Sequence, residues 1–193
     1  AQIEDFQKKL WLKKKFVVET NWCITLDNID ESFWPEIISN KAQIDEWIAM
    51  YAIDEAESWS NPPAVDFLRK NTNLIIDTKH FPNTFKYALL ESIPNLDEQT
   101  SGVMLNSDNY QALKLLLTRY EKRLQSIYID PPYNTDASPI MYKNGYKDSS
   151  WLSLITDRVS LSKQLMCDGA VFAFAIDDFE EKFAHCVLDE VFP

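Results

Sequence analysis

The sequence has few of the residues that most often build cofactor and metal sites. It contains three glycines, three cysteines and two histidines in 193 residues, and no Gly-x-Gly pair occurs. A glycine-rich loop that wraps a nucleotide phosphate is therefore not expected. The cysteines are odd in number and have no CxxC spacing, so we predict no disulfide framework and no metal site. This cysteine usage favours a reducing compartment such as the cytoplasm.

Long apolar runs and an excess of positive charge are also absent. No apolar run approaches the roughly 18 residues that a membrane-spanning helix needs, so we expect no association with a membrane. With 19 Lys and Arg against 30 Asp and Glu, the net charge of −11 by itself disfavours DNA as a partner. The first residues lack the pattern of a signal peptide, and the chain begins at Ala1 and stops at Pro193 directly after two apolar residues. These ends lead us to expect a piece of a longer protein.

Hydrophobic residues make up 46% of the chain, which is enough for a core, and their spacing differs between the first and second parts of the chain. Residues 1–73 read as a helical and irregular region, in which Ile44, Trp47, Ile48 and Tyr51 recur at helical spacing and Asn40 is a plausible N-cap. From residue 74 strands alternate with helices, which predicts a mainly parallel sheet covered by helices on both faces. The strands are expected at 74–77, 103–106, 126–130 and 170–176, and the helices at 81–93, 109–123, 149–166 and 179–191.

The sharpest feature is Asp130-Pro131-Pro132-Tyr133, which follows an apolar strand directly. In open α/β sheets ligands bind outside the carboxyl ends of the strands. Proline has no N–H to continue the ladder, so the Asp130 carboxylate and a carbonyl of the Pro-Pro pair become two neighbouring acceptors, with an aromatic ring beside them. Two acceptors and a stacking ring suit a planar group with an exocyclic amine, such as adenine N6 or cytosine N4. The simpler alternative is a strand-ending turn with a surface tyrosine.

Further candidates follow the same expected strand ends. Asp108 and Asp177 come after strands on the side where a ligand would lie, although capping of the next helix is the simpler interpretation of Asp177. The loop after Tyr133 adds four residues that would reach a base or phosphate, or else stabilise the loop or pack against it. They are Asn134, Thr135, Tyr142 and Tyr146.

Five segments of the sequence, taken together in chain order, carry a family resemblance. The chain resembles the modification (Mod) subunit of type III restriction–modification systems and related site-specific DNA adenine-N6 methyltransferases, over roughly residues 10–193. The resemblance implies that residues 74–193 are an incomplete Rossmann-like (class I) methyltransferase domain, preceded by the helical and irregular region 1–73. The segments are LIIDTKHF (74–81), GVMLNSDNYQAL (102–113), YIDPPYNT (128–135), YKDSSWLSLITDRVSLSKQLMCDGAVFAFAIDDFE (146–180) and VLDEVFP (187–193).

The resemblance also implies roles and partners. Asp130 and the carbonyl of Pro131 would hold the amino group of an adenine flipped out of double-stranded DNA, and Tyr133 would stack on the base. The methyl donor would be S-adenosylmethionine, with Asp108 at the border of its pocket. The partners would be a restriction (Res) subunit and a second Mod copy.

The chain departs from the family pattern in one respect. The FxGxG segment that binds the cofactor in this family lies far downstream of the DPPY motif, after a target-recognition region, and neither is present here. We therefore expect this chain alone to bind S-adenosylmethionine weakly or not at all. Cytosine-N4 methylation, an RNA-base or protein-glutamine methyltransferase, and a non-catalytic scaffold that contacts a restriction subunit stay open as alternatives.

Overall fold

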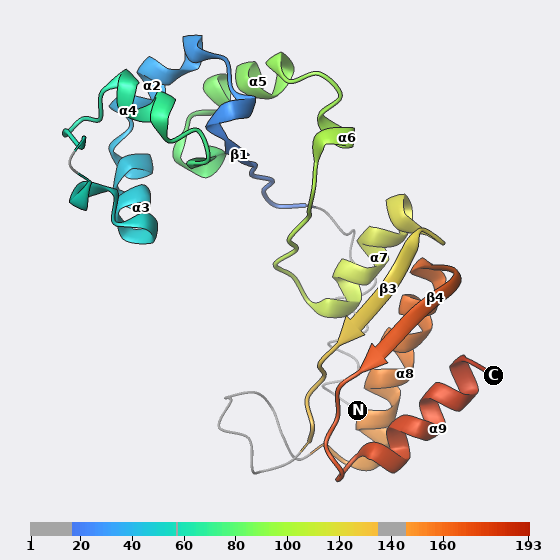
Figure 1. Cartoon of the computed structure of the whole chain (residues 1–193). Coiled ribbons are helices and arrows are strands. Elements are labelled where there is room, and N and C mark those ends of the chain that lie inside the picture. The colour runs from blue at the N-terminus through green and yellow to red at the C-terminus, as the bar shows by residue number, and fades with distance from the viewer. Residues whose placement is uncertain (1–16, 57, 135–145) are drawn as a thin grey trace. The chain divides into compact units, whose positions relative to one another are not determined.

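The computed structural model describes residues 17–56, 58–134 and 146–193, and it divides into two compact units. An N-terminal unit covers Phe16–Val103, and a C-terminal unit covers Met104–Pro193 (Figure 1). Each unit has its own buried hydrophobic cluster. None of the helices among the described residues is long and apolar enough to cross a membrane.

The N-terminal unit is helical around a small antiparallel sheet. Strand β1 pairs with β2, and Ile24 lies opposite Ile76 in the register. The core contains Trp34, Trp47 and Phe85, all at most 4% exposed. The elements are β1 (Cys23–Thr25), α2 (Trp34–Ser39), α3 (Lys41–Tyr51), α4 (Val65–Lys70), β2 (Ile75–Asp77), α5 (Asn83–Ser92) and α6 (Leu96–Gln99), with 3-10 turns at Leu26–Asn28, Glu31–Phe33, Ile53–Glu55 and Thr78–His80.

Helix α3 confirms the sequence prediction for this region. Its N-cap is Asn40, whose side chain accepts a hydrogen bond from the backbone N–H of Gln43 at 3.1 Å. Ile44 and Trp47 are buried, as the helical spacing predicts. The helix ends at Tyr51, because Ala52 adopts a left-handed conformation with φ 48°.

Strand β2 lies in the N-terminal unit, so the boundary expected between residues 73 and 74 falls inside this unit. The side chains of α3 explain why the strand is held there. The Gln43 amide accepts from the N–H of Asp77 at 2.7 Å and donates to the carbonyl of Ile75 at 3.3 Å. The Trp47 indole N–H donates to the same carbonyl at 2.5 Å. Side chains of a helix thus hydrogen-bond the edge of β2 that β1 leaves open, which no local sequence pattern indicates.

The C-terminal unit contains the predicted strand–helix alternation. The strands β3 (Leu124–Ile129) and β4 (Met166–Phe174) are parallel, and Ile129 lies opposite Phe174. The helices are α7 (Asn109–Tyr120), α8 (Asp148–Leu165) and α9 (Glu181–Val191), close to their expected bounds. The expected strand 103–106 is wrong: this segment is irregular, and Met104 is 96% exposed.

Only one face of the β3–β4 sheet is covered within the described residues. Ile129, Phe172 and Phe174 pack with residues of α8 and α9, whereas Tyr128 is 69% and Val171 64% exposed. The expectation that the apolar run 170–176 is buried on both faces is therefore wrong for the described residues, as is the expectation of helices on both faces. The part of the fold prediction that the structure confirms is a mixed helix and strand fold with a small parallel sheet.

Strand β4 begins earlier than the sequence predicts. Asp168 and Gly169, which precede the strand expected at 170–176, lie within β4. They occupy an irregularity where the register shifts between Leu124 and Ser126 of β3. Gly169 has φ 76°, a backbone conformation that costs glycine little and other residues more.

Candidate functional site

The Asp-Pro-Pro-Tyr segment follows β3 directly, as the sequence predicts. The last ladder bond runs from the N–H of Ala175 to the carbonyl of Ile129 at 2.9 Å, immediately before Asp130. Pro131 and Pro132 follow the strand and belong to no helix or strand. The prolines therefore end the ladder at the carboxyl edge of the sheet, where parallel sheets bind their ligands.

Trp151 holds the Pro-Pro segment from the covered side of the sheet. It lies in the first turn of α8, is fully buried, and donates its indole N–H to the carbonyl of Pro132 at 2.9 Å. The sequence does not predict this hydrogen bond. It predicts a helix from residue 149, and α8 starts one residue earlier, at Asp148 after Lys147.

Two neighbouring acceptors stay available beside that anchored carbonyl. Asp130 is exposed. Within the described part of the chain, no hydrogen bond or ion pair reaches its carboxylate, and none reaches the carbonyl of Pro131. The carbonyl of Pro132 is taken by Trp151. This arrangement can accept two N–H bonds from an external donor, which is the chemistry that the sequence predicts for these two groups.

Asn134 follows Tyr133 and is buried, with φ 58°. Its Nδ2 donates to the carbonyl of Tyr146 at 2.9 Å and to Glu180 Oε1 at 2.6 Å, and its Oδ1 accepts from the N–H of Tyr146 at 2.6 Å. These bonds use both donor hydrogens of the Asn134 amide. They favour the loop-stabilising role, one of the two roles that the sequence leaves open for this residue.

The other loop candidates are only partly described. Tyr146 is half-buried and packs against the core of the C-terminal unit, which favours packing over base contact. Thr135 and Tyr142 lie outside the described residues. The structure therefore brings together Asp130, Pro131 and Tyr133 by sequence adjacency, and it adds Asn134 and Tyr146 as their support.

Asp108 and Asp177 both take part in local turns. Asp108 is the N-cap of α7, where its Oδ1 accepts from the N–H of Gln111 at 3.2 Å and its Oδ2 lies 3.8 Å from Arg158 Nη2. Asp177 accepts from the N–H of Phe179 at 3.1 Å. In each carboxylate, one oxygen accepts the hydrogen bond of the cap or turn, and the other oxygen can still accept a hydrogen bond.

Glu180 is a site residue that sequence reasoning missed. It is fully buried at the N-cap of α9, and its Oε2 has no hydrogen-bond partner among the described residues. Glutamate is rarely buried, so the sequence carries no signal for this position. Its only indication is the place after β4, at the carboxyl edge of the sheet.

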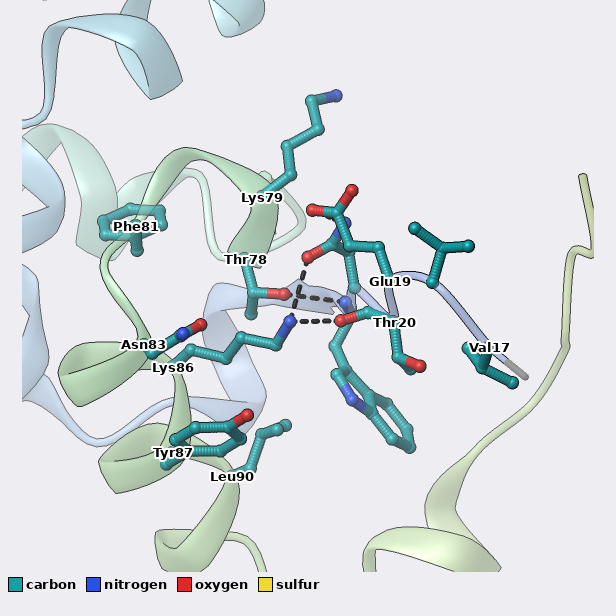
Figure 2. A pocket seen from close by; sticks show the side chains of 13 residues that line it. Val17, Glu19, Thr20, Thr78, Lys79, Phe81, Asn83, Lys86, Tyr87 and Leu90 are labelled. Carbon is teal, nitrogen blue, oxygen red and sulfur yellow. Dashed lines mark hydrogen bonds between the residues drawn. The ribbon is translucent and has the colours of Figure 1, made fainter.

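A hollow of about 470 Å³ lies in the N-terminal unit, between the segment before β1 and helix α5 (Figure 2). Lys86 donates there to the carbonyl of Thr20 and, at 3.0 Å, to Asn21 Oδ1, while Thr78 accepts from the N–H of Trp22 at 2.8 Å. These bonds join the segment 20–22 to α5 and the neighbouring turn. None of the predicted site residues lines this hollow.

Beside it, Lys79 joins an ion-pair network. Its Nζ lies 2.6 Å from Glu46 Oε1 and 2.8 Å from Asp77 Oδ2, and these two hydrogen-bonded carboxylates hold the pKa of Lys79 above its usual range. Burial raises the pKa of Glu46, but the hydrogen bonds and charges of Lys79 and His80 together lower it by more than burial raises it. The pKa of Glu46 therefore lies below its ordinary value. This network is explained by the packing of β2 on α3 and needs no ligand.

The chain is similar to DNA methyltransferases of restriction–modification systems. It is 26% identical to the probable type III HindVI Mod subunit of Haemophilus influenzae over 125 residues, which is 61% of this chain. It is 25% identical over 126 residues to the type III EcoPI Mod subunit of Escherichia phage P1, and 29% identical over 111 residues to the type II methyltransferase M.KpnI of Klebsiella pneumoniae. No protein-family model matches the chain.

These relatives are much longer than the matched region. The match covers 61%, 50% and 53% of this chain, but only 17%, 20% and 26% of the three relatives. The resemblance to type III Mod subunits read from the sequence motifs is thus confirmed by relatives over half of the chain or more. The likeness concerns a minor part of the length of those proteins.

Proposed function

We propose that this chain carries the amine-binding acceptor site of an S-adenosylmethionine-dependent methyltransferase that modifies adenine N6 in a specific DNA sequence. One observation carries the proposal. At the carboxyl edge of a parallel sheet, the carboxylate of Asp130 and the carbonyl of Pro131 are unengaged within the described chain, while Trp151 occupies the carbonyl of Pro132. The similarity to Mod subunits supports the same reading.

The chemistry follows from the two acceptors. An exocyclic amine has two N–H donors, and Asp130 and the carbonyl of Pro131 would accept one each. The nitrogen lone pair would then stand out of the plane of the base, ready for direct in-line attack on the methyl carbon of the donor without a covalent enzyme intermediate. The carbon–sulfur bond of the donor would break, the thioether S-adenosylhomocysteine would leave, and one amine proton would pass to Asp130 or to water. Tyr133 would stack on the base, which must be flipped out of the duplex to reach the site.

The cofactor in this proposal is S-adenosylmethionine, which would supply an electrophilic methyl group. Asp108 and Asp177 fit a place at the border of its site, because the bonds within each turn use only one carboxylate oxygen; the second oxygen of Asp108 faces Arg158 at 3.8 Å. These two residues do not make a pocket, so we expect the isolated chain to bind S-adenosylmethionine weakly or not at all. A calorimetric titration that gave micromolar affinity would contradict this expectation.

The wider setting is proposed from the relatives. We assign to the whole protein a Rossmann-like sheet larger than β3 and β4, with residues 74–193 supplying part of it. Double-stranded DNA is the substrate, a Res subunit and a second Mod copy are the partners, and the location is cytoplasmic. The similarity to Mod subunits of type III restriction–modification enzymes supports these assignments.

The test is methylation of duplex DNA by the product of the complete open reading frame that encodes this chain. We expect transfer of labelled methyl groups to DNA, N6-methyladenine in the nuclease digest, and a loss of at least about 100-fold in Asp130→Ala with DNA binding retained. The matched control is Asp168→Ala, an exposed aspartate within β4. N4-methylcytosine in the digest would move the assignment to cytosine, and unchanged methylation by Asp130→Ala would refute the acceptor role.

A further inference from the structure

The hydrogen bonds of Asn134 join three parts of the C-terminal unit that are distant in sequence. Its side-chain amide pairs with both backbone groups of Tyr146, twelve residues later, at 2.6 and 2.9 Å. Its second donor hydrogen reaches Glu180 Oε1 at 2.6 Å, 46 residues later. A residue that follows the Asp-Pro-Pro-Tyr segment is thereby tied to the N-terminus of α9, the helix that comes after β4.

Glu180 is a costly residue for this place in a fold. It is fully buried, one carboxylate oxygen accepts from Asn134, and the other has no partner in the described chain. A buried carboxylate loses its hydration, and a single neutral donor compensates only part of that loss. An apolar side chain would be the less costly choice for stability, so a buried acceptor at position 180 points to a function.

The backbone conformation of Asn134 also costs stability. Its φ of 58° lies in the left-handed region, which asparagine tolerates better than most residues but which still costs energy. The conformation persists because three hydrogen bonds hold it. Asn134 is also 7% exposed, so its side chain serves the interior and not the solvent.

We propose that Asn134 and Glu180 are positioning residues for the amine acceptors. We call this pair the 134–180 clamp. The clamp holds the segment at Asn134, and the indole of Trp151 holds it at Pro132. Tyr133 lies between these two points, and Asp130 and Pro131 lie just before them. The proposal rests on the proposed methyl transfer, because acceptors must hold an amine within a fraction of an ångström for in-line attack.

The kinetic test uses the product of the complete open reading frame. In Glu180→Ala we expect kcat for DNA methylation to fall at least about 10-fold while KM for DNA changes less than about 3-fold, because the clamp orients the acceptors and does not touch DNA. Glu180→Gln keeps an acceptor oxygen at the same place, so it should retain most of the rate. The control is Glu190→Ala, an exposed glutamate on the same helix.

A charge exchange separates positioning from general stability. Asn134→Asp places two carboxylates side by side and should lower kcat as much as Glu180→Ala. Adding Glu180→Gln to Asn134→Asp lets the amide introduced at position 180 donate to the carboxylate introduced at position 134. We expect this double variant to recover at least about a third of the lost rate. Equal rates in Asn134→Asp and the double variant would overturn the proposal.

A measurement without activity checks the clamp in the chain itself. The N–H of Tyr146 donates to Asn134 Oδ1, so its hydrogen exchange should be slow in the native chain and at least about 10-fold faster in Asn134→Ala and Glu180→Ala. Exchange of this N–H that is fast in the native chain, or full kcat in Glu180→Ala, would overturn the clamp while leaving the acceptor role of Asp130 intact. Loss of methylation in all proteins, native included, would instead refute the proposed function.

Discussion

The two units of the chain differ in how completely they cover their own sheets. In the N-terminal unit, Ile76 of β2 is fully buried, and Gln43 and Trp47 hydrogen-bond the edge of the strand that β1 leaves open. In the C-terminal unit, one face of the β3–β4 sheet is packed, and the other exposes Tyr128 and Val171. The first unit closes around its own core, whereas the second has an apolar face that its described residues do not cover.

The candidate site lies in the less completely covered unit. Burial of apolar surface supplies most of the stability of a domain, and the N-terminal unit buries its apolar side chains in one cluster around β1 and β2. The C-terminal unit also buries two hydrogen-bonded polar side chains, Asn134 and Glu180, beside the candidate site. The comparison teaches that the two units differ in what they bury and cover, and four changes test this difference.

The largest effect is expected in the N-terminal core. Trp47 is fully buried and donates to the carbonyl of Ile75. Trp47→Ala should lower the free energy of unfolding of the N-terminal unit by about 3–5 kcal/mol, through the cavity and the lost hydrogen bond. Urea denaturation, read by hydrogen exchange in α5, measures it. Tyr87→Ala on the exposed side of α5 is the control, and similar losses in both variants would contradict a closed core.

Adjacent residues of β3 test the uncovered face. Ile129 packs into the core, whereas Tyr128 is 69% exposed. Ile129→Thr should lower the free energy of unfolding of the C-terminal unit by about 1–3 kcal/mol, and Tyr128→Thr by less than about 0.5 kcal/mol. Thermal denaturation of the chain measures both. A loss at Tyr128 as large as that at Ile129 would show that this face is covered.

A smaller effect on stability is expected when alanine replaces a glycine in each unit. Nothing lies within 4 Å of a Cβ built at Gly169 or Gly102, but Gly169 has φ 76°. Gly169→Ala should therefore cost about 1 kcal/mol through backbone strain alone, while Gly102→Ala should be nearly neutral. Chemical denaturation measures the two changes. Equal effects would mean that the irregularity in β4 does not require the left-handed conformation.

The smallest effect is electrostatic and concerns Glu46. Its pKa in the folded chain lies below the ordinary value, so its contribution to stability is present above that value and is lost as the pH falls through the folded pKa. The stability of the N-terminal unit should decrease on acidification to about pH 3, by less than about 1 kcal/mol from this residue. Glu46→Gln should reduce the decrease, and the same change at exposed Glu91 should not.

Much of the fold could be predicted from local patterns. Helix α3 with its Asn40 cap, helices α5, α7, α8 and α9, and the parallel strands β3 and β4 follow from hydrophobic period and capping chemistry. The strand expected at 103–106 does not form, because no strand within the described residues pairs with it. Strand β2 was assigned to the wrong sheet, since pairing with β1 depends on contacts more than fifty residues apart.

The candidate site shows the same limit. Asp130 and Pro131 could be predicted as acceptors from adjacency alone, because proline chemistry is local. Glu180 could not, because its meaning depends on a hydrogen bond to a residue 46 positions away. The choice of Pro131 over Pro132 as the available carbonyl was implied by the family resemblance, and the indole of Trp151 now supplies its physical reason.

The sequence by itself determined where the longer helices and the acceptor groups lie along the chain and approximately where β3 and β4 lie, since propensity, capping and the missing N–H of proline act within a few residues. Only the tertiary structure decided which strands pair, which face of β3 and β4 is covered, and which carbonyl of the Pro-Pro pair stays available. The scarcity of glycine and of positive charge in the chain does not exclude the proposed chemistry, because a carboxylate and a backbone carbonyl are sufficient to accept an amine once the fold holds them in place.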